Sequence, residues 1–191
     1  PSLSEPSPDY NGLTFAETFG DLAFTLYSHA VSLRDLGCTQ SPMNAWITLN
    51  GVETLPLRME RHVENAQKVA GFLQQHPSVE WVSYAGLSSS PYYKLAQKYL
   101  QGKAGSVFTF GIRGGYESGL RLLEKVELFS HVSNIGDSRS LILHPASTTH
   151  RQLSDEQRLT AGAGPEVIRL SVGIESAEDL IADLEQALEG L

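Results

Sequence analysis

Four short stretches in the second half of the chain are predicted as β-strands, and in the second and fourth of them apolar residues recur with the period of two that is typical of strands. They are SVEWVSY (78–84), GSVFTFGIRGG (105–115), RSLILHP (139–145) and PEVIRLSVGIES (165–176). Pro145 ends the third stretch, because proline cannot continue a central strand. The pattern therefore predicts four strands.

The strand predicted at 165–176 has two unlike faces. Its apolar face carries Ile168, Leu170, Val172 and Ile174. The opposite face carries Arg169, Ser171 and Gly173, and so presents a guanidinium group, a hydroxyl group and a gap. The apolar face is suited to burial, whereas the polar face is either a solvated surface or the wall of a site.

Apolar residues spaced three and four apart predict helices around these strands. Two helical patterns, over 18–37 and 41–75, precede the first strand, and we expect Pro56 to break the second one. Further helices are expected at 92–102, at 117–132, at 154–159 and from the N-cap residue Ser176 onward. Strands alternating with helices predict one small sheet with helices packed on one side, an α/β fold of the α+β type.

Composition limits the possible partners of the chain. Of its 191 residues 41% are hydrophobic and 19% are charged, and the net charge of −8 argues against nucleic acid as a partner. No apolar run approaches the roughly 18–20 residues of a membrane span, and no signal peptide is visible. Cys38 is the only cysteine, so no internal disulfide can form. This favours a reducing compartment and predicts a cytoplasmic protein.

Arg169 is the first candidate for chemistry. On a half-exposed strand it could be an ordinary surface arginine. It could equally bind a carboxylate, because a guanidinium group forms two parallel hydrogen bonds with a carboxylate and stays charged. A strand would also aim it more accurately than a loop.

The stretch GDSRSLILHPASTTH (136–150) is the second candidate. Its first polar residues, Ser138, Arg139 and Ser140, either line the mouth of a ligand site or belong to a plain loop. His144 and His150 do not have the spacing of a metal site, and no cysteine lies near them in the sequence. We therefore expect no metal.

Three ordered motifs resemble one known family. They are SPMNAWITLNGVETLPLRMERHVENAQKVAGFL (41–73), SLILHPASTTH (140–150) and VIRLSVGIE (167–175). Together they are similar to the carboxy-terminal part of the pyridoxal-phosphate (PLP) enzymes of cysteine and methionine metabolism. Within that family the three motifs are most similar to those of the O-acetylhomoserine sulfhydrylases. Cystathionine γ-synthases, cystathionine γ-lyases and methionine γ-lyases remain alternatives, as does a non-catalytic α/β binding module.

The resemblance implies a small domain of a fold-type I PLP enzyme, with a roughly four-stranded, mostly antiparallel sheet. It also implies a transferase that replaces the acyloxy group of an O-acyl-homoserine by sulfide, with PLP as electron sink. Arg169 would bind the substrate carboxylate, the Ser140 N–H would be a second donor, and Arg139 would face the substrate. Several relatives have an acidic residue at the position of Arg139, which suits a distal amino group. An arginine there argues mildly against cystathionine as substrate.

The family's Schiff-base lysine has no counterpart in this chain. The five lysines are Lys68, Lys94, Lys98, Lys103 and Lys125, and none has the expected Ser/Thr-rich context. The chain opens on Pro1 and looks cut from a longer protein, although processing could also explain this. We therefore expect no catalytic residue here, no bound PLP and no activity of the chain alone.

The resemblance also implies how the chain divides. Residues 1–13, with three prolines, would form an extended arm or linker, 14–75 the helices that bridge to a large domain, and 76–191 the small α/β domain. The family forms homo-oligomers, typically tetramers. Apolar residues of the bridging helices, such as Trp46, Ile47, Leu49 and Leu55, would then be exposed in the chain alone, which predicts self-association through residues 20–60.

Overall fold

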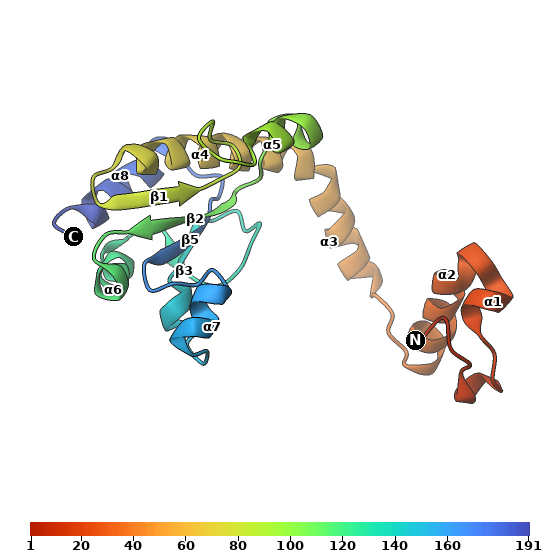
Figure 1. Ribbon diagram of the computed structural model, residues 1–191. Coiled ribbons are helices and arrows are strands. Elements are labelled where there is room, and N and C mark those ends of the chain that lie inside the picture. Colours follow the sequence, from red (N-terminus) through yellow and green to blue (C-terminus); the bar gives the residue numbers. More distant parts are fainter. The chain divides into compact units, whose positions relative to one another are not determined.

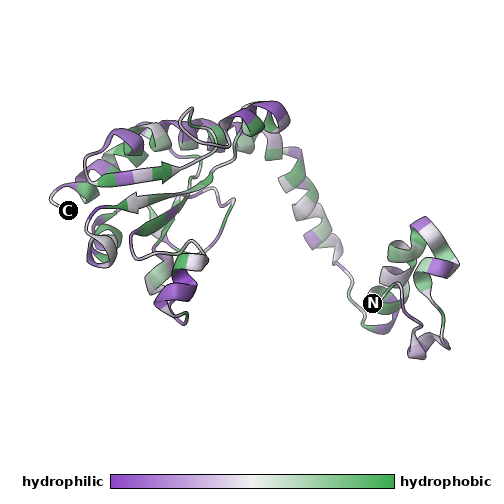
Figure 2. Cartoon of the chain, in the orientation of Figure 1, coloured by the Kyte–Doolittle hydropathy of each residue, from purple (hydrophilic) through white to green (hydrophobic).

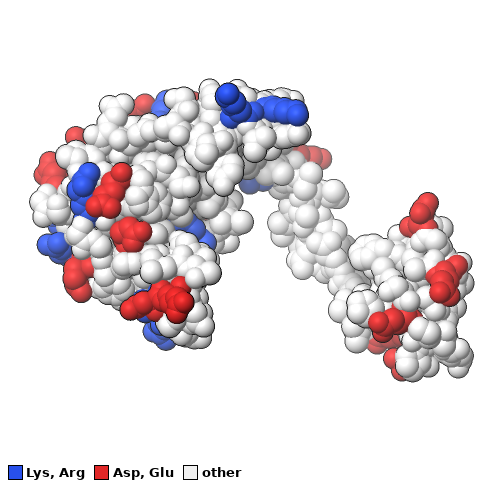
Figure 3. All heavy atoms as spheres, in the orientation of Figure 1, with Lys and Arg blue, Asp and Glu red and all other residues white.

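The computed structural model describes all residues, 1–191, and divides into two compact units, Pro1–Glu53 and Thr54–Leu191. No helix in either unit is both long enough and apolar enough to cross a membrane. Residues 1–53 hold six acidic side chains and one basic one, and the charged side chains seen on this unit in Figure 3 are acidic.

The first unit is a set of short helices. In order they are η1 (Pro8–Tyr10), α1 (Phe15–Phe19), η2 (Gly20–Leu22), α2 (Ala23–Tyr27), the π-helical η3 (Ser28–Asp35) and α3 (Pro42–Glu53). The helix predicted over 18–37 is thus interrupted, and Gly20 has a positive φ of 51° where α1 ends. The predicted arm contains η1 and an isolated bridge between Ser7 and Leu13. Phe15 is the buried centre of an aromatic cluster.

Helix α3 buries none of its residues. Trp46, Ile47 and Leu49 are 62%, 56% and 61% exposed, and hydrophobic residues line much of this helix in Figure 2. Leu55, the first residue of α4 in the second unit, is 42% exposed. An apolar surface of this kind is typical of an interface.

We expect the chain of residues 1–191, studied alone, to self-associate at micromolar concentration, because association removes the apolar side chains of α3 from water. Light scattering in the presence of a reductant, which excludes a disulfide through the exposed Cys38, measures the mass. The double variant Trp46→Glu, Leu49→Glu should be smaller. A monodisperse monomer of the unmodified chain would contradict the prediction.

The second unit contains one sheet and most of the helices. It comprises α4 (Leu55–Gln75), β1 (Val79–Ser83), α5 (Tyr93–Leu100), β2 (Val107–Ile112), α6 (Gly115–Lys125), β3 (Ser130–His131), β4 (Leu141–Leu143), η4 (Pro145–Ser147), α7 (Asp155–Thr160), β5 (Val167–Ser171) and α8 (Ala177–Leu188). The sheet order is β1-β2-β5-β4-β3. All pairs are antiparallel except β3 with β4.

One face of this sheet forms the core. Helices α4, α6 and α8 pack on that face (Figure 1). The fully buried core side chains include Phe110, Ile112, Leu122, Ile142, Ile168, Leu170, Leu180 and Leu184. The apolar face predicted for the last strand is confirmed for Ile168, Leu170 and Val172, whereas Ile174 lies beyond β5 and is half-buried. Burial of this face contributes the main favourable free energy of folding.

The sheet has five strands where the periodicity predicts four. The additional strand, β3, lies within the segment 117–132 that the apolar spacing predicts as one helix. Helix α6 ends at Lys125 instead. The carboxylate of Asp183 on α8 accepts the N–H groups of residues 127, 128 and 129 at 2.8, 2.9 and 3.2 Å. These bonds hold the bent segment 127–129 that leads into β3.

The break predicted at Pro56 is confirmed, since α3 ends at Glu53 and α4 begins at Leu55. Proline is tolerated in the first turn of a helix, where its missing N–H would have no intrahelical partner. Helix α4 belongs to the same compact unit as the sheet. The division predicted for the parent protein, at residues 75 and 76, stays a prediction.

Candidate functional site

The face of the sheet opposite the core carries Arg169 in the middle of β5. Its neighbours across the sheet are Thr109 on β2 and Leu143 on β4, whose side chains point to the same face. Arg169 is half-buried. The sequence pattern therefore correctly predicted that the Arg169 side chain lies on the face opposite the core. The strand backbone fixes the direction of this side chain.

The guanidinium group of Arg169 lies beside a polar loop, residues 132–139, which we call the site loop. Nη2 of Arg169 donates to the carbonyl oxygen of Asn134 at 3.4 Å, a long hydrogen bond. The N–H groups of Ser133 and Asn134 donate to no acceptor of the protein, and both residues are exposed. The guanidinium group of Arg169 thus lies beside a stretch of backbone that has two N–H groups without an acceptor, and a carboxylate bound to Arg169 would lie near them.

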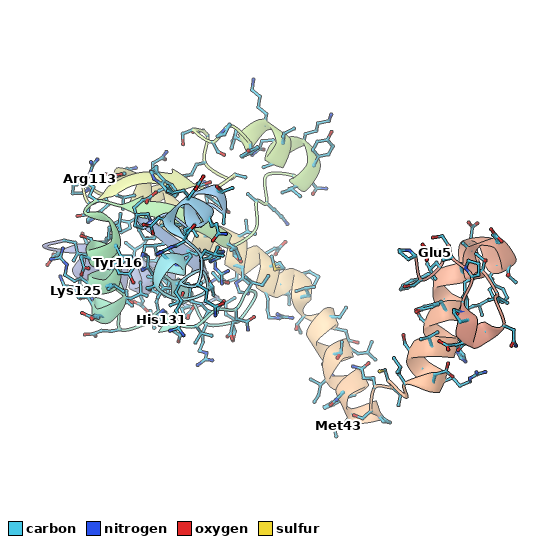
Figure 4. All side chains as sticks on the ribbon, turned by 60° about the horizontal axis from the view of Figure 1, so that its bottom comes forward. Glu5, Met43, Arg113, Tyr116, Lys125 and His131 are labelled. Carbon is cyan, nitrogen blue, oxygen red and sulfur yellow. The ribbon has the colours of Figure 1, made fainter.

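A hollow of about 510 Å³ lies on the same face. It is lined by His131, Ser133, Leu143, Ser147, Thr148, Thr149 and Arg151. Leu143 is the strand partner of Arg169, and His131, labelled in Figure 4, is the last residue of β3 before the site loop. The hydroxyl groups and the cationic Arg151 make this hollow suitable for a small anionic or polar ligand.

Ser140, predicted as a second carboxylate donor, has another partner in the structure. It is completely buried, and its N–H donates to Oε1 of Glu175 at 2.7 Å. Its hydroxyl donates to Oε2 of Glu175 at 2.9 Å and accepts the N–H of Gly173 at 2.7 Å. The Ser140 N–H is therefore engaged by an internal carboxylate, and the free donors lie at Ser133 and Asn134 instead.

Arg139, the other predicted substrate residue, is mostly exposed. Its side chain lies 3.7 Å from the carboxylate of Asp137, and its N–H donates to the same carboxylate at 3.0 Å. No interaction joins Arg139 to Arg169. Its role toward a substrate stays a prediction.

The gap expected beside Arg169 is filled by the chain itself. A Cβ atom at Gly173 would lie 2.4 Å from the carbonyl oxygen of Ser138 and 2.6 Å from the carbonyl carbon of Arg139. Ser171 is 2% exposed, and its hydroxyl has no hydrogen-bond partner. Glycine at position 173 thus allows the end of the site loop to pack directly on the strand that carries Arg169.

Two residues of α4 that sequence reasoning missed hold the segment after β5. His62, 1% exposed, has its Nδ1 atom 2.6 Å from the carbonyl oxygen of Val172. Asn65, fully buried, donates through Nδ2 to the carbonyl oxygens of Gly173 and Glu175 at 3.0 and 2.8 Å. A histidine and an asparagine three residues apart on an apolar helix face were the available signal, since buried polar groups need partners.

His144 is a structural residue rather than a ligand of a site. It is completely buried, its Nε2 atom lies 2.9 Å from the carbonyl oxygen of Pro165, and its Nδ1 atom lies 3.0 Å from the hydroxyl oxygen of Ser147. The carbonyl can only accept, so the proton is assigned to Nε2. Tyr116, labelled in Figure 4, contacts the ring edge to face. This network ties the end of β4 to Pro165, two residues before β5 begins.

Burial lowers the pKa of His144 below its ordinary value of 6.5, although the bond to Pro165 acts in the opposite direction. The unfolded chain therefore binds a proton more readily than the folded chain. We expect folding stability from this residue to be fully present above pH 6.5 and to be lost as the pH falls below it. Urea unfolding between pH 8 and pH 5 measures the effect. A His144→Gln variant should lose less stability on acidification; equal losses would contradict the prediction.

The lysines of the chain do not form a PLP site. All five are exposed. Lys68 and Lys103 line a hollow of about 590 Å³, but their ammonium groups lie 3.0 and 3.3 Å from Glu64 and Glu60. A cofactor phosphate there would face two carboxylates, which repel it. The residues that line this hollow therefore do not fit the cofactor that the resemblance implies.

Comparison with known proteins gives consistent results. The family described as "Cys/Met metabolism PLP-dependent enzyme" matches residues 13–189. The chain is 51% identical over 188 residues to O-acetyl-L-homoserine sulfhydrylase 1 of Thermus thermophilus, covering 98% of this chain and 45% of that protein. It is 46% identical over 189 residues to homocysteine synthase of Schizosaccharomyces pombe, covering 99% of this chain and 44% of that protein.

A solved structure is also similar. O-acetylhomoserine (thiol)-lyase of Campylobacter jejuni, whose crystal structure has N'-pyridoxyl-lysine-5'-monophosphate at position 205 of that chain, matches with a TM-score of 0.87 and 44% identity, over 99% of this chain and 45% of that chain. The chain therefore spans less than half the length of these relatives. A match over nearly all of its residues shows that this chain belongs to the family of PLP-dependent enzymes of Cys/Met metabolism.

Proposed function

We propose that this chain is the carboxy-terminal part of an O-acetylhomoserine sulfhydrylase, and that it supplies the site for the substrate's α-carboxylate. The parent enzyme would exchange the acetoxy group of O-acetyl-L-homoserine for sulfide, releasing acetate and forming homocysteine. Relatives with 51% and 49% identity carry the sulfhydrylase name. PLP would be held by residues outside this chain, and the parent would be a homo-oligomer.

The observation that carries the proposal is the half-buried guanidinium group of Arg169 beside free backbone donors. The fork of Arg169 would bind both carboxylate oxygens, which requires the long bond to the Asn134 carbonyl to be exchanged for the ligand. The N–H groups of Ser133 and Asn134 would donate to the same carboxylate. The hollow lined by His131, Thr148 and Arg151 offers space beside this anchor.

In this proposal the chain's own residues bind and orient the substrate. Arg169 holds the carboxylate at one end, so the rest of the amino acid is presented in one direction. Orientation of this kind contributes to rate because the reacting groups no longer have to find each other. Ser140 hydrogen-bonds to Glu175 and to the backbone N–H of Gly173, and so it does not contact the ligand in this proposal.

The direct test uses the full-length enzyme that contains this chain, loaded with PLP. It should form homocysteine from O-acetyl-L-homoserine and sulfide, and turn over L-cystathionine far more slowly. Release of acetate should match homocysteine in amount. Efficient cleavage of cystathionine without homocysteine synthesis from the ester would contradict the proposal and identify the parent as a cystathionine lyase. A full-length protein without PLP and without either activity would favour a binding module.

A further inference from the structure

The carboxylate of Glu175 closes a ring of hydrogen bonds between the end of β5 and the start of β4. It accepts both the N–H and the hydroxyl of Ser140, and the Ser140 hydroxyl accepts the N–H of Gly173. Ser140 has no solvent exposure, so water cannot replace a lost partner there without rearrangement. Removing the Glu175 carboxylate would leave two buried donors without an acceptor.

This ring lies where the site loop returns to the sheet. The N–H of Ile174 donates to the carbonyl oxygen of Ser138 at 2.9 Å, and Gly173 packs against the backbone of Ser138 and Arg139. The other end of the loop is held by the N–H of Ser130, which donates to the carbonyl oxygen of Ser140 at 3.0 Å. Ser140 is therefore common to both attachments of the loop.

Between these attachments the site loop has little to hold it in place. Residues 132–136 are exposed. The N–H of Val132 donates to the carbonyl oxygen of Ser130 on β3 at 3.0 Å, and beyond Val132 the long bond from Arg169 to Asn134 is the hydrogen bond that joins this part to the sheet. The position of the free N–H groups of Ser133 and Asn134 relative to Arg169 thus depends on the base of the loop. A displacement of about 1 Å in such a site can cost on the order of 100-fold in rate or binding.

We propose that Glu175 is a positioning residue for the substrate carboxylate: through Ser140 and Gly173 it fixes the base of the site loop, and thereby holds the Ser133 and Asn134 donors opposite Arg169. This inference rests on the proposed function of Arg169. Glu175 itself makes its side-chain hydrogen bonds to Ser140. Its influence on a ligand is therefore indirect and specific to the ligand's carboxylate.

The test compares two probes that differ only in that carboxylate. They are L-homoserine and 3-aminopropan-1-ol, and their binding to the full-length holoenzyme is titrated through the absorbance of the bound cofactor. Four variants are compared with the unmodified enzyme: Glu175→Ala, Glu175→Gln, Arg169→Ala and, as control, Glu185→Ala. Glu185 is an exposed glutamate on the outer side of α8.

Glu175→Ala should weaken L-homoserine binding by about 10- to 100-fold, because two buried donors lose a charged acceptor. Glu175→Gln keeps the shape and one acceptor oxygen, so about a 3- to 10-fold loss is expected. Binding of 3-aminopropan-1-ol should be unchanged in both variants, and Glu185→Ala should leave both probes unaffected. The Gln variant keeps the test valid if the Ala variant does not fold.

The outcomes separate this inference from the proposed function. If Arg169→Ala selectively weakens L-homoserine but the Glu175 variants bind both probes normally, or lose both equally, Glu175 does not position the site. If Arg169→Ala does not discriminate between the probes, the carboxylate assignment fails and the inference fails with it. Selective loss in the Arg169 and Glu175 variants together supports both.

Discussion

Replacing Arg169 by alanine in the full-length enzyme is expected to lower kcat/KM for O-acetyl-L-homoserine by roughly 30- to several-thousand-fold. Loss of one partner from a hydrogen-bonded charge pair that excludes water costs roughly 2–5 kcal/mol, much of it from the carboxylate left without a counter-charge. Arg169 lies half-buried on β5, the central strand of the sheet. The absorbance spectrum of bound PLP should stay normal.

Arg169→Lys should also lower kcat/KM strongly, because an ammonium group cannot form the two parallel hydrogen bonds of the guanidinium fork. Arg113→Ala is the matched control. Arg113 follows β2, is largely exposed, and donates to the carbonyl oxygen of Pro77 away from the site loop. Steady-state kinetics at varied ester concentration measure the effect. A nearly unchanged KM and kcat for Arg169→Ala would show that the carboxylate binds elsewhere.

Replacing Gly173 by alanine is expected to destabilise the second unit by about 3 kcal/mol and to abolish most of the activity. The added Cβ would lie 2.4 Å from the Ser138 carbonyl oxygen and 2.6 Å from the Arg139 carbonyl carbon. Both are backbone atoms, so relief requires a movement of the chain and not a rotamer change, and overpacking of this kind typically costs 1–3 kcal/mol or more. The displaced segment is the end of the site loop beside Arg169.

Gly71→Ala provides the same chemical change without the clash. Gly71 lies inside α4, and a Cβ there meets no atom within 4 Å. Alanine should stabilise this helix by about 0.5–1 kcal/mol, because glycine loses more conformational freedom on folding. Urea unfolding of the full-length variants measures the change in the free energy of unfolding that each substitution causes. Equal stability of Gly173→Ala and the unmodified protein would mean that the loop is not held as described.

Structural features that depend on the local pattern of residues along the chain were predictable from the sequence. The apolar face of β5 follows from a spacing of two, the strands β1, β2 and β4 follow from short apolar stretches, and the break before Pro56 follows from the proline. Arg169 was found for the same reason, because alternation places it opposite that apolar face. The motifs around it also pointed to the family.

Contacts between residues that are far apart in the sequence were not predictable in this way. Asp183 accepts N–H groups about 55 positions away, in the segment between the end of α6 and β3. Glu175 occupies the Ser140 N–H that was expected to face a ligand, and Gly173 receives the backbone of the site loop instead of leaving a gap. His62 reaches the Val172 carbonyl across 110 positions.

The difference has a physical cause. Alternation along the chain determines which side chains face a core, because burial of apolar surface does not depend on which partner covers it. A hydrogen bond instead needs one donor and one acceptor at a defined distance and angle. For Ser140, Glu175 and Gly173 that geometry exists only after β4, β5 and the site loop have packed together. The sequence by itself thus determined the family, the two faces of β5 and the position of Arg169, whereas the tertiary structure decided that Ser133 and Asn134, and not Ser140, present free donors beside it.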